Sequence, residues 1–292
     1  MTRMESPLRL RRNSAADDDR PRGVWKYLIL LVMISSIIIV PYGWLILRAF
    51  TNQQGEFTLS NWIFLTEETT LARGVVLPAA TQPMVTSFLF AIVMAVLVVS
   101  ITVPAAYAMS RTEYTGRRFM AKMLIVLDAF PSVALLSSFI LLLSNLNLVN
   151  KLSGVILLKV AMYLPGSIWL MKGFFDNISW DIEWAAIVDG ASRFKTFLRI
   201  IVPAAKPGIA VILVNSFLSG WGEYILINLF IRGRSSTMSS LIGAMLDSED
   251  GKYLVSPGVL AAACFCYIIP VIILFAVSQK LLLQVKQGGS KQ

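Results

Sequence analysis

The chain of 292 residues contains no histidine, only two cysteines and few charged side chains. Without histidine, the His-containing zinc sites and the Ser-His-Asp and Cys-His catalytic sets are excluded. Cys264 and Cys266 lie two residues apart in an apolar run, where one helix points them in different directions. We therefore expect no internal disulfide, but two small buried apolar side chains. The sequence also lacks a G-x-x-x-x-G-K-[ST] segment, so it has no ATPase phosphate-binding loop.

Charged residues make up 15% of the chain and hydrophobic residues 56%. Soluble domains carry about 25% charged residues, so the composition indicates a membrane protein that crosses the bilayer several times. The net charge of +9 does not by itself indicate nucleic acid, because in a membrane chain the location of the charge matters more than its sum.

Six apolar runs are long enough to span a bilayer, which takes about 20 residues. They predict an all-α, polytopic membrane protein with six transmembrane helices, at about Trp25–Phe50, Met84–Ser110, Phe119–Leu143, Leu152–Phe175, Pro207–Ile231 and Gly258–Leu283.

Most of the 26 Lys and Arg residues fall in the two terminal tails and in the loops after the second and fourth spans. Positive loops remain in the cytoplasm, so we expect both termini there. The predicted layout is a cytoplasmic tail (1–24), a first span (25–50), an extracytoplasmic loop (51–83), a five-helix core (84–283) and a second cytoplasmic tail (284–292). The N-terminal tail is too polar to fold alone.

A polar hairpin, Asp181 to Val211, separates the fourth and fifth spans. Apolar residues recur at helical spacing on both sides of Gly190, which is suited to end a helix. Ser179 or Asp181 could cap the first helix, and Pro203 cannot continue the hydrogen-bond ladder of the second. Two interpretations remain open, an interfacial helix in lipid headgroups and a docking element for a cytoplasmic partner.

Within the hairpin, Ala185-Ala186, Asp189-Gly190 and Pro203, thirteen residues after the glycine, resemble the "EAA" loop of permease subunits in bacterial ABC importers. The "DGAS" segment, "RTEYTGRR" and "SGWGEYILINLF" resemble the carbohydrate branch of that family, specifically the maltose-type second permease subunit. Aligned on Gly190, the family's glutamate falls at Trp184, and Glu183 precedes it, about 100° away on a helix.

The resemblance implies a type I ABC importer transmembrane fold in the bacterial plasma membrane. It also implies that residues 179–207 form a coupling loop, which docks on a cytoplasmic ATPase. Its partners would be a second permease subunit in a heterodimer, two ATP-binding subunits and an extracytoplasmic solute-binding protein, with no nucleic acid. ATP and magnesium would act in the ATPase, so this chain is expected to be non-catalytic, without cofactor or metal. The expected coupling residues are Glu183, Trp184, Ala185, Ala186, Asp189, Gly190 and Pro203.

Away from the ends of the predicted spans lie the charged residues Asp128, Lys159 and Glu223. Such residues are costly in lipid and are candidates for function or for pairing between helices. Near Glu223, a continuous helix would place Trp221, Tyr224 and Asn228 on one face, where aromatic surfaces and polar groups suit a sugar. These four residues are the candidates for the substrate path, and ordinary packing between helices is the alternative.

The resulting hypothesis is the permease subunit of an ATP-driven carbohydrate importer, taking a disaccharide or oligosaccharide. The alternatives are an ion-driven secondary transporter, which would show inverted repeats and buried acids, an importer permease for a glycerol-phosphate type of solute, and a membrane anchor without transport.

Overall fold

A computed structural model describes residues 24–70, 76–232, 236–246, 248–249, 252–253 and 255–288. The predicted N-terminal tail, except Val24, and the last residues of the predicted C-terminal tail lie outside these ranges. Helices dominate the described residues, and the strands are two-residue pairs. The prediction of an all-α, polytopic membrane protein is confirmed.

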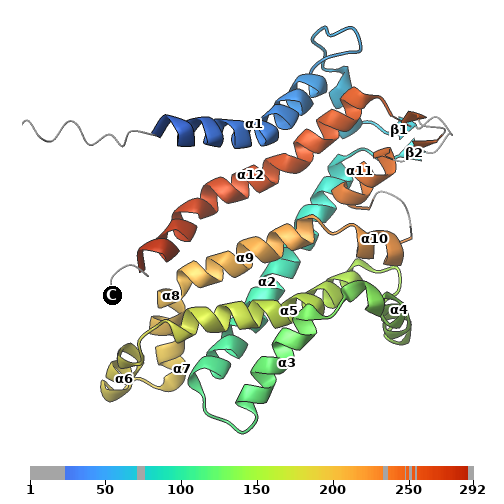
Figure 1. Ribbon diagram of the computed structural model, residues 1–292. Coiled ribbons are helices and arrows are strands. Elements are labelled where there is room, and N and C mark those ends of the chain that lie inside the picture. The colour runs from blue at the N-terminus through green and yellow to red at the C-terminus, as the bar shows by residue number, and fades with distance from the viewer. Residues whose placement is uncertain are drawn as a thin grey trace, which may run out of the picture.

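Three helices form the centre of the molecule: α2 (Thr81–Arg111), α5 (Leu152–Asp176) and α9 (Lys206–Trp221). Helix α2 packs against both α5 and α9 (Figure 1). The main hydrophobic core lies between them and includes Phe90 and Met94 of α2 and Met171 of α5. At Gly220, an added Cβ would lie 3.0 Å from the Cα of Ala91, so the missing side chain allows α9 to approach α2 closely.

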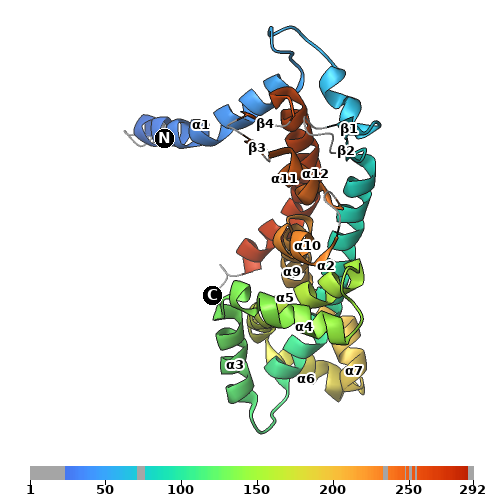
Figure 2. The same cartoon turned by 90° about the vertical axis from the view of Figure 1, so that its right-hand side faces the viewer.

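Helix α1 (Val24–Ala49) stands apart from this centre, and none of the residues in its most apolar stretch is buried. Only its C-terminal end packs on α12 (Pro257–Gly288) and the 3₁₀ helix η1 (Ser60–Leu65), as Figures 1 and 2 show. Asn61 stabilises this end by donating from Nδ2 to the carbonyl oxygens of Ala49 and Thr51, at 3.2 and 3.0 Å. A helix so exposed and apolar needs lipid or another subunit around it.

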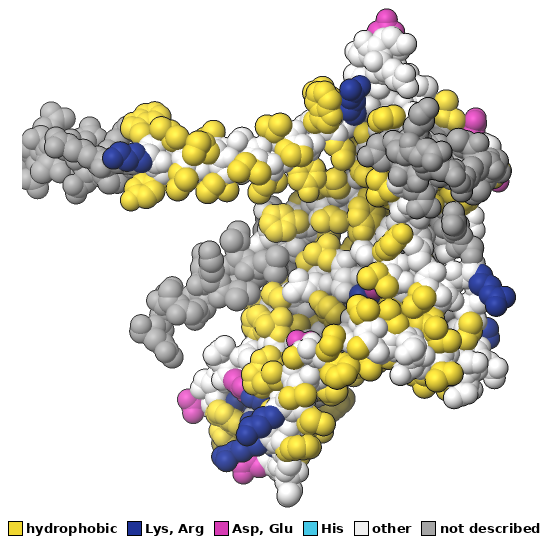
Figure 3. Space-filling model, turned by 45° about the vertical axis from the view of Figure 1, so that its right-hand side comes forward, with side chains coloured by type: hydrophobic (Ala, Val, Ile, Leu, Met, Phe, Trp, Pro, Cys, Tyr) yellow, Lys and Arg dark blue, Asp and Glu magenta, His cyan; other side chains and the backbone are white. Residues whose placement is uncertain are grey.

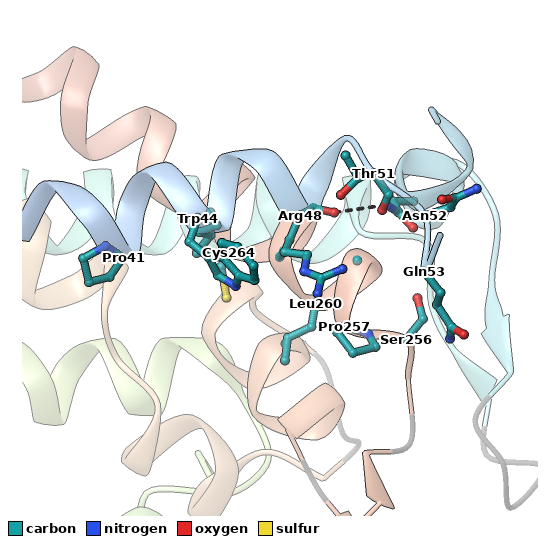
Figure 4. Close-up of a pocket in the computed structure, with 14 residues that line it drawn as sticks. Pro41, Trp44, Arg48, Thr51, Asn52, Gln53, Ser256, Pro257, Leu260 and Cys264 are labelled. Atoms are coloured by element: carbon teal, nitrogen blue, oxygen red, sulfur yellow. Dashed lines mark hydrogen bonds between the residues drawn. The ribbon is translucent and has the colours of Figure 1, made fainter. Parts of the chain in front are cut away.

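The same end of the molecule carries α11 (Met238–Leu246) and the strand pairs β1 (Thr69–Thr70) with β2 (Val76–Leu77) and β3 (Ser248–Glu249) with β4 (Lys252–Tyr253). A pocket of about 630 Å³ lies here between α1 and α12, and Trp44 and Arg48 of α1 face it (Figure 4). The Arg48 guanidinium lies 5.0 Å from the centre of the Trp44 ring.

The third predicted span is not one straight helix. Helix α3 (Arg117–Ala129) ends before Pro131, and the chain continues through the 3₁₀ helix η2 (Ser132–Leu135) into α4 (Leu136–Asn145), bent by 87°. Phe130, which precedes the proline, is extended with φ −73° and ψ 132°. Proline restricts the preceding residue to this conformation and removes a backbone donor, which explains the break.

The fifth predicted span is also interrupted, so its prediction as one continuous helix is wrong. Helix α9 ends at Trp221, Gly222 to Tyr224 are non-helical, and α10 (Ile225–Phe230) follows. Among the described residues, four helices are long and apolar enough to cross a membrane. Up to six spans result if two bent pairs each count as one, namely Arg117–Ala129 with Val133–Asn145 and Arg193–Ala204 with Lys206–Trp221. Figure 3 shows charged side chains mainly at the ends of one face, with a largely uncharged band between them.

The close contact at Gly220 yields a test of helix packing. Gly220→Val should lower the unfolding free energy by about 1–3 kcal/mol, because the added methyl groups would meet Ala91 and Met94. Gly173→Val is the matched control, since nothing lies within 4 Å of a Cβ there. Thermal unfolding of the purified protein in detergent measures both variants, and equal melting temperatures would contradict the packing.

Candidate functional site

The hairpin between α5 and α9 consists of two helical arms joined at Gly190. The first arm is α6 (Trp180–Val188), which begins at Ser179, whose Oγ accepts a hydrogen bond from the backbone N–H of Asp181 at 3.2 Å. Gly190 is left-handed, with φ +85°, and its N–H donates to the carbonyl oxygen of Ile187. Of the two predicted caps, Ser179 and Asp181, Ser179 is the one that caps α6, and the predicted glycine turn is confirmed.

The second arm runs through α7 (Arg193–Thr196), the π-helical segment η3 (Phe197–Ile201) and α8 (Val202–Ala204). Ser192 caps α7 by accepting from the N–H of Lys195 at 3.3 Å. Pro203 offers no N–H to the carbonyl of Arg199, and the wider π turn directly precedes it. The arm ends after Ala204 and bends by 73° into α9.

Glu183 points into the protein from α6 and is 5% exposed. Its Oε1 accepts a hydrogen bond from the Tyr107 hydroxyl at 2.6 Å, and its Oε2 lies 3.4 Å from Nε of Arg111. Tyr107 and Arg111 both belong to the last turns of α2. The carboxylate therefore attaches the hairpin to the end of a central helix.

Arg111 connects three elements at this point. Its Nη2 donates to the carbonyl oxygens of Phe175 and Ile178 at 2.8 and 2.6 Å, and its guanidinium stacks 4.4 Å from the centre of the Trp180 ring. The last carbonyls of a helix have no partner inside the helix. Arg111 therefore supplies hydrogen-bond donors to carbonyl oxygens at the end of α5, and its positive charge faces the carboxylate of Glu183. We call Tyr107, Arg111 and Glu183 the anchor cluster.

The opposite face of α6 is open to solvent. Trp184 is 53% exposed, Ala185 and Asp189 are exposed, and Ala186 is buried against the protein. Trp184 and Trp180 line a pocket of about 430 Å³ together with Arg111 and the basic Arg193 of the second arm. The structure thus separates the predicted coupling residues into an inward set, Glu183 and Ala186, and an outward set that a partner can contact.

The interruption between α9 and α10 carries a second buried charge pair. Glu223 is 7% exposed and pairs with Lys159 Nζ of α5 at 2.5 Å. Its Oε1 also accepts from the backbone N–H of Leu226 at 2.8 Å, at the start of α10. The Glu223 carboxylate therefore contacts both a backbone N–H in the first turn of α10 and the ammonium group of Lys159.

The predicted stripe of Trp221, Tyr224 and Asn228 is wrong, because the helix stops at Gly222 and the three side chains share no helical face. Trp221 is 2% exposed, donates from Nε1 to the carbonyl oxygen of Tyr267 at 3.1 Å, and stacks on its ring. The Tyr224 ring lies against Gly243 of α11, and Asn228 is exposed on α10. Trp221 therefore packs α9 against α12.

Sequence reasoning missed Tyr107 and Arg111 as partners of Glu183, and Lys159 as the partner of Glu223. The signal for the second pair was present, since two opposite charges in predicted spans favour pairing. No group of three or more Cys, Asp or Glu side chains in the described residues is arranged to hold a metal ion.

Residues 99–285 match the family described as binding-protein-dependent transport system inner membrane component. The match includes the anchor cluster, the hairpin and the interrupted helix. The chain belongs to this family. It is therefore a multi-pass subunit of an inner-membrane transport system.

Two relatives cover most of the chain. It is 26% identical to the diacetylchitobiose uptake system permease protein NgcG of Streptomyces coelicolor over 91% of this chain and 88% of that protein. It is 26% identical to the trehalose/maltose transport system permease protein MalG of Thermococcus litoralis over 91% and 97%.

A solved structure shares the fold, with a TM-score of 0.73 at 20% identity over 91% of this chain and 98% of that one. It is a crystal structure of a bacterial ABC transporter involved in the import of the acidic polysaccharide alginate. The expected ABC importer transmembrane fold is thus confirmed.

The anchor cluster predicts how firmly the hairpin is held. Glu183→Ala would leave Arg111 buried without its counter-charge, which typically costs about 3–5 kcal/mol. Amides of α6 should then exchange hydrogen faster, as hydrogen exchange with mass spectrometry measures. Asp181→Asn removes an exposed charge from the same turn but keeps an oxygen that can accept from Ser179 Oγ, so it should change this exchange little. Unchanged exchange in both variants would show that the cluster does not hold the hairpin.

Proposed function

We propose that this chain is one permease subunit of an ATP-driven ABC importer for carbohydrates. The observation that carries the proposal is a hairpin with the family's Ala-Ala and Asp-Gly residues, anchored on one face and open on the other. The relatives named for diacetylchitobiose and for trehalose and maltose support a carbohydrate as the solute. Both termini and the hairpin would face the cytoplasm, as the distribution of Lys and Arg indicates.

The exposed face of the hairpin would dock on a cytoplasmic ATP-binding subunit. Trp184, Ala185 and Asp189 supply one flat aromatic surface, one small residue and one charge, and Phe194 of the second arm is 70% exposed. Exposed aromatic side chains at such surfaces commonly carry much of the binding energy. Gly190 and Pro203 shape the two arms, and Glu183 transmits their movement to α2.

The remaining machinery would lie in partner subunits. ATP and magnesium would bind the two ATPase subunits, since this chain lacks a phosphate-binding loop. A second permease subunit would complete the path as a heterodimer, and a binding protein would deliver the solute from outside. Of the residues predicted to line the substrate path, Tyr224 and Asn228 are exposed and could contact a solute. Glu223 pairs with Lys159, and Trp221 is buried where it packs α9 against α12.

A glycerol-phosphate type of solute is less well supported than a sugar. Phosphate recognition favours unpaired cations, whereas Lys159 is already neutralised by Glu223. An ion-driven secondary transporter would not need the hairpin, which belongs to transport systems that depend on a binding protein.

Uptake by the reconstituted assembly tests the proposal. Proteoliposomes that hold this chain with its second permease and ATPase subunits, supplied with the binding protein, should import maltose, trehalose or diacetylchitobiose only when ATP is present on the ATPase side. Uptake driven by an ion gradient without the ATPase, or uptake of glycerol 3-phosphate in place of every sugar, would overturn it.

The glycine turn provides a matched pair of variants. Gly190→Pro should abolish ATP-driven uptake while the protein still inserts in the membrane, because proline fixes φ near −65° where the turn needs +85°. Gly55→Pro is the control, since Gly55 has the same φ of +85° in a turn at the opposite end of the molecule. Membrane protein amounts and sugar uptake are compared, and normal uptake by Gly190→Pro would refute the role of the hairpin.

A further inference from the structure

A pocket of about 400 Å³ opens beside the bend between α3 and α4, on the side that faces α5. Small-molecule sites have volumes in this range and combine apolar walls with a few polar groups. Its lining includes two charged residues, Asp128 and Lys159, and three aromatic residues, Phe130, Phe139 and Tyr163. None of these five residues belongs to the hairpin.

Asp128 is an exposed carboxylate in a membrane-spanning segment. The described residues give it no hydrogen-bond or ion-pair partner, and it packs against Gly166 of α5, where an added Cβ would overlap its Oδ1. A carboxylate that faces lipid is strongly unfavourable, and such groups border water or a partner. Since a pocket lies directly beside it, the simplest placement for this face is along a water-filled path.

Lys159 supplies hydrogen-bond donors, whereas Asp128 supplies acceptors. Its side chain is 20% exposed, and its ammonium group is held by Glu223, which is 6% exposed. An ammonium group has three N–H donors, so donors remain for a ligand in the pocket. Asp128 can accept hydrogen bonds from hydroxyls, and Lys159 can donate to them.

The aromatic residues provide flat apolar surfaces next to these polar groups. Phe130 is 52% exposed at the bend, and Phe139 and Tyr163 are half-buried on the pocket walls. A sugar ring has C–H faces that stack on aromatic rings and hydroxyls that need donors and acceptors. The charges of Asp128, Glu223 and Lys159 leave a net negative charge, which disfavours an anionic sugar.

We propose that this pocket is a binding subsite for one ring of a neutral carbohydrate, with Asp128 and Lys159 contacting its hydroxyls. The inference rests on the proposed function and extends it, because it assigns solute contact to this subunit and excludes acidic sugars from the subsite. The bend at Pro131 forms one wall of the pocket, so a change in that bend would open or close the subsite.

Direct binding tests the proposal. The probe is whichever of radiolabelled maltose, trehalose or diacetylchitobiose the wild-type assembly imports, and equilibrium dialysis uses the permease–ATPase assembly without binding protein. Asp128→Asn and Phe130→Ala should each weaken binding about ten-fold or more, as expected for a lost hydrogen bond to a charged group or a lost stacking surface. Both variants should still assemble with the second permease and the ATPase subunits, as size-exclusion chromatography measures.

Two matched controls lie on α3 outside the pocket. Lys122→Gln changes an exposed charge and Phe119→Ala removes an aromatic ring that is 69% exposed, and neither should change sugar binding. Galacturonate, an acidic sugar, should not compete with the probe in the wild-type assembly. Competition by galacturonate at similar concentrations would overturn the charge argument.

Access to the pocket is a second readout. Leu135→Cys, in a chain with Cys264 and Cys266 replaced by alanine, should react with a charged, water-soluble thiosulfonate, and the sugar should slow this reaction. No reaction in any state of the assembly would show that lipid or the second permease covers the pocket, and would overturn the proposal. If the wild-type assembly imports none of the three sugars, the proposed function itself fails, which separates that failure from the failure of the subsite.

Discussion

The contact between Arg111 and Glu183 determines how the hairpin is attached to the rest of the molecule. Removing two charges from water is costly, and the cost is offset only when the remaining donors and acceptors find partners. Here the guanidinium bonds the carbonyl oxygens of Phe175 and Ile178 and stacks on Trp180, and the carboxylate accepts from Tyr107. Nε and Nη1 of Arg111 and Oε2 of Glu183 have no hydrogen-bond partner among the described residues, so these contacts offset the cost only in part. The end of α2, the end of α5 and the start of α6 are therefore joined at one point. Helix α2 in turn packs along both α5 and α9.

The pair of Lys159 and Glu223 also joins separate helices through buried charges, at a second position in the molecule. It joins α5 to the interruption between α9 and α10, where backbone groups would otherwise lack partners in a membrane. Non-helical backbone at such depth occurs where protein or a water-filled cavity surrounds it. Helices α5 and α9 thus connect the end of the molecule that holds the anchor cluster with the polar region around Lys159 and Glu223.

Local sequence patterns predict the cap and the turn of the hairpin, but they do not predict where the helices of the third and fifth spans are interrupted. Ser179 and Gly190 act through their own backbone neighbours, so the cap and the turn followed from residue type alone. Neighbouring helix positions lie about 100° apart, in keeping with a Glu183 that is 5% exposed beside a Trp184 that is 53% exposed. The partners of Glu183, however, are more than 60 residues away in the chain. The helix stop at Gly222 was missed because the apolar pattern continues across it into Ile225 and Leu226. Trp221, a residue type suited to a sugar, proved to pack between helices, since burial depends on neighbours that the local pattern does not show.

We propose that the anchor cluster transmits ATP-driven movement from the hairpin to the membrane helices. The most direct measurement is the number of sugar molecules imported per ATP hydrolysed in proteoliposomes, compared between the wild-type chain and Arg111→Met. Methionine keeps much of the side-chain volume and removes the charge that faces Glu183 and the hydrogen bonds to the carbonyl oxygens of Phe175 and Ile178. We expect ATP hydrolysis to continue and the ratio of import to hydrolysis to fall severalfold or more. An unchanged ratio, with the variant fully assembled, would show that coupling does not pass through this cluster.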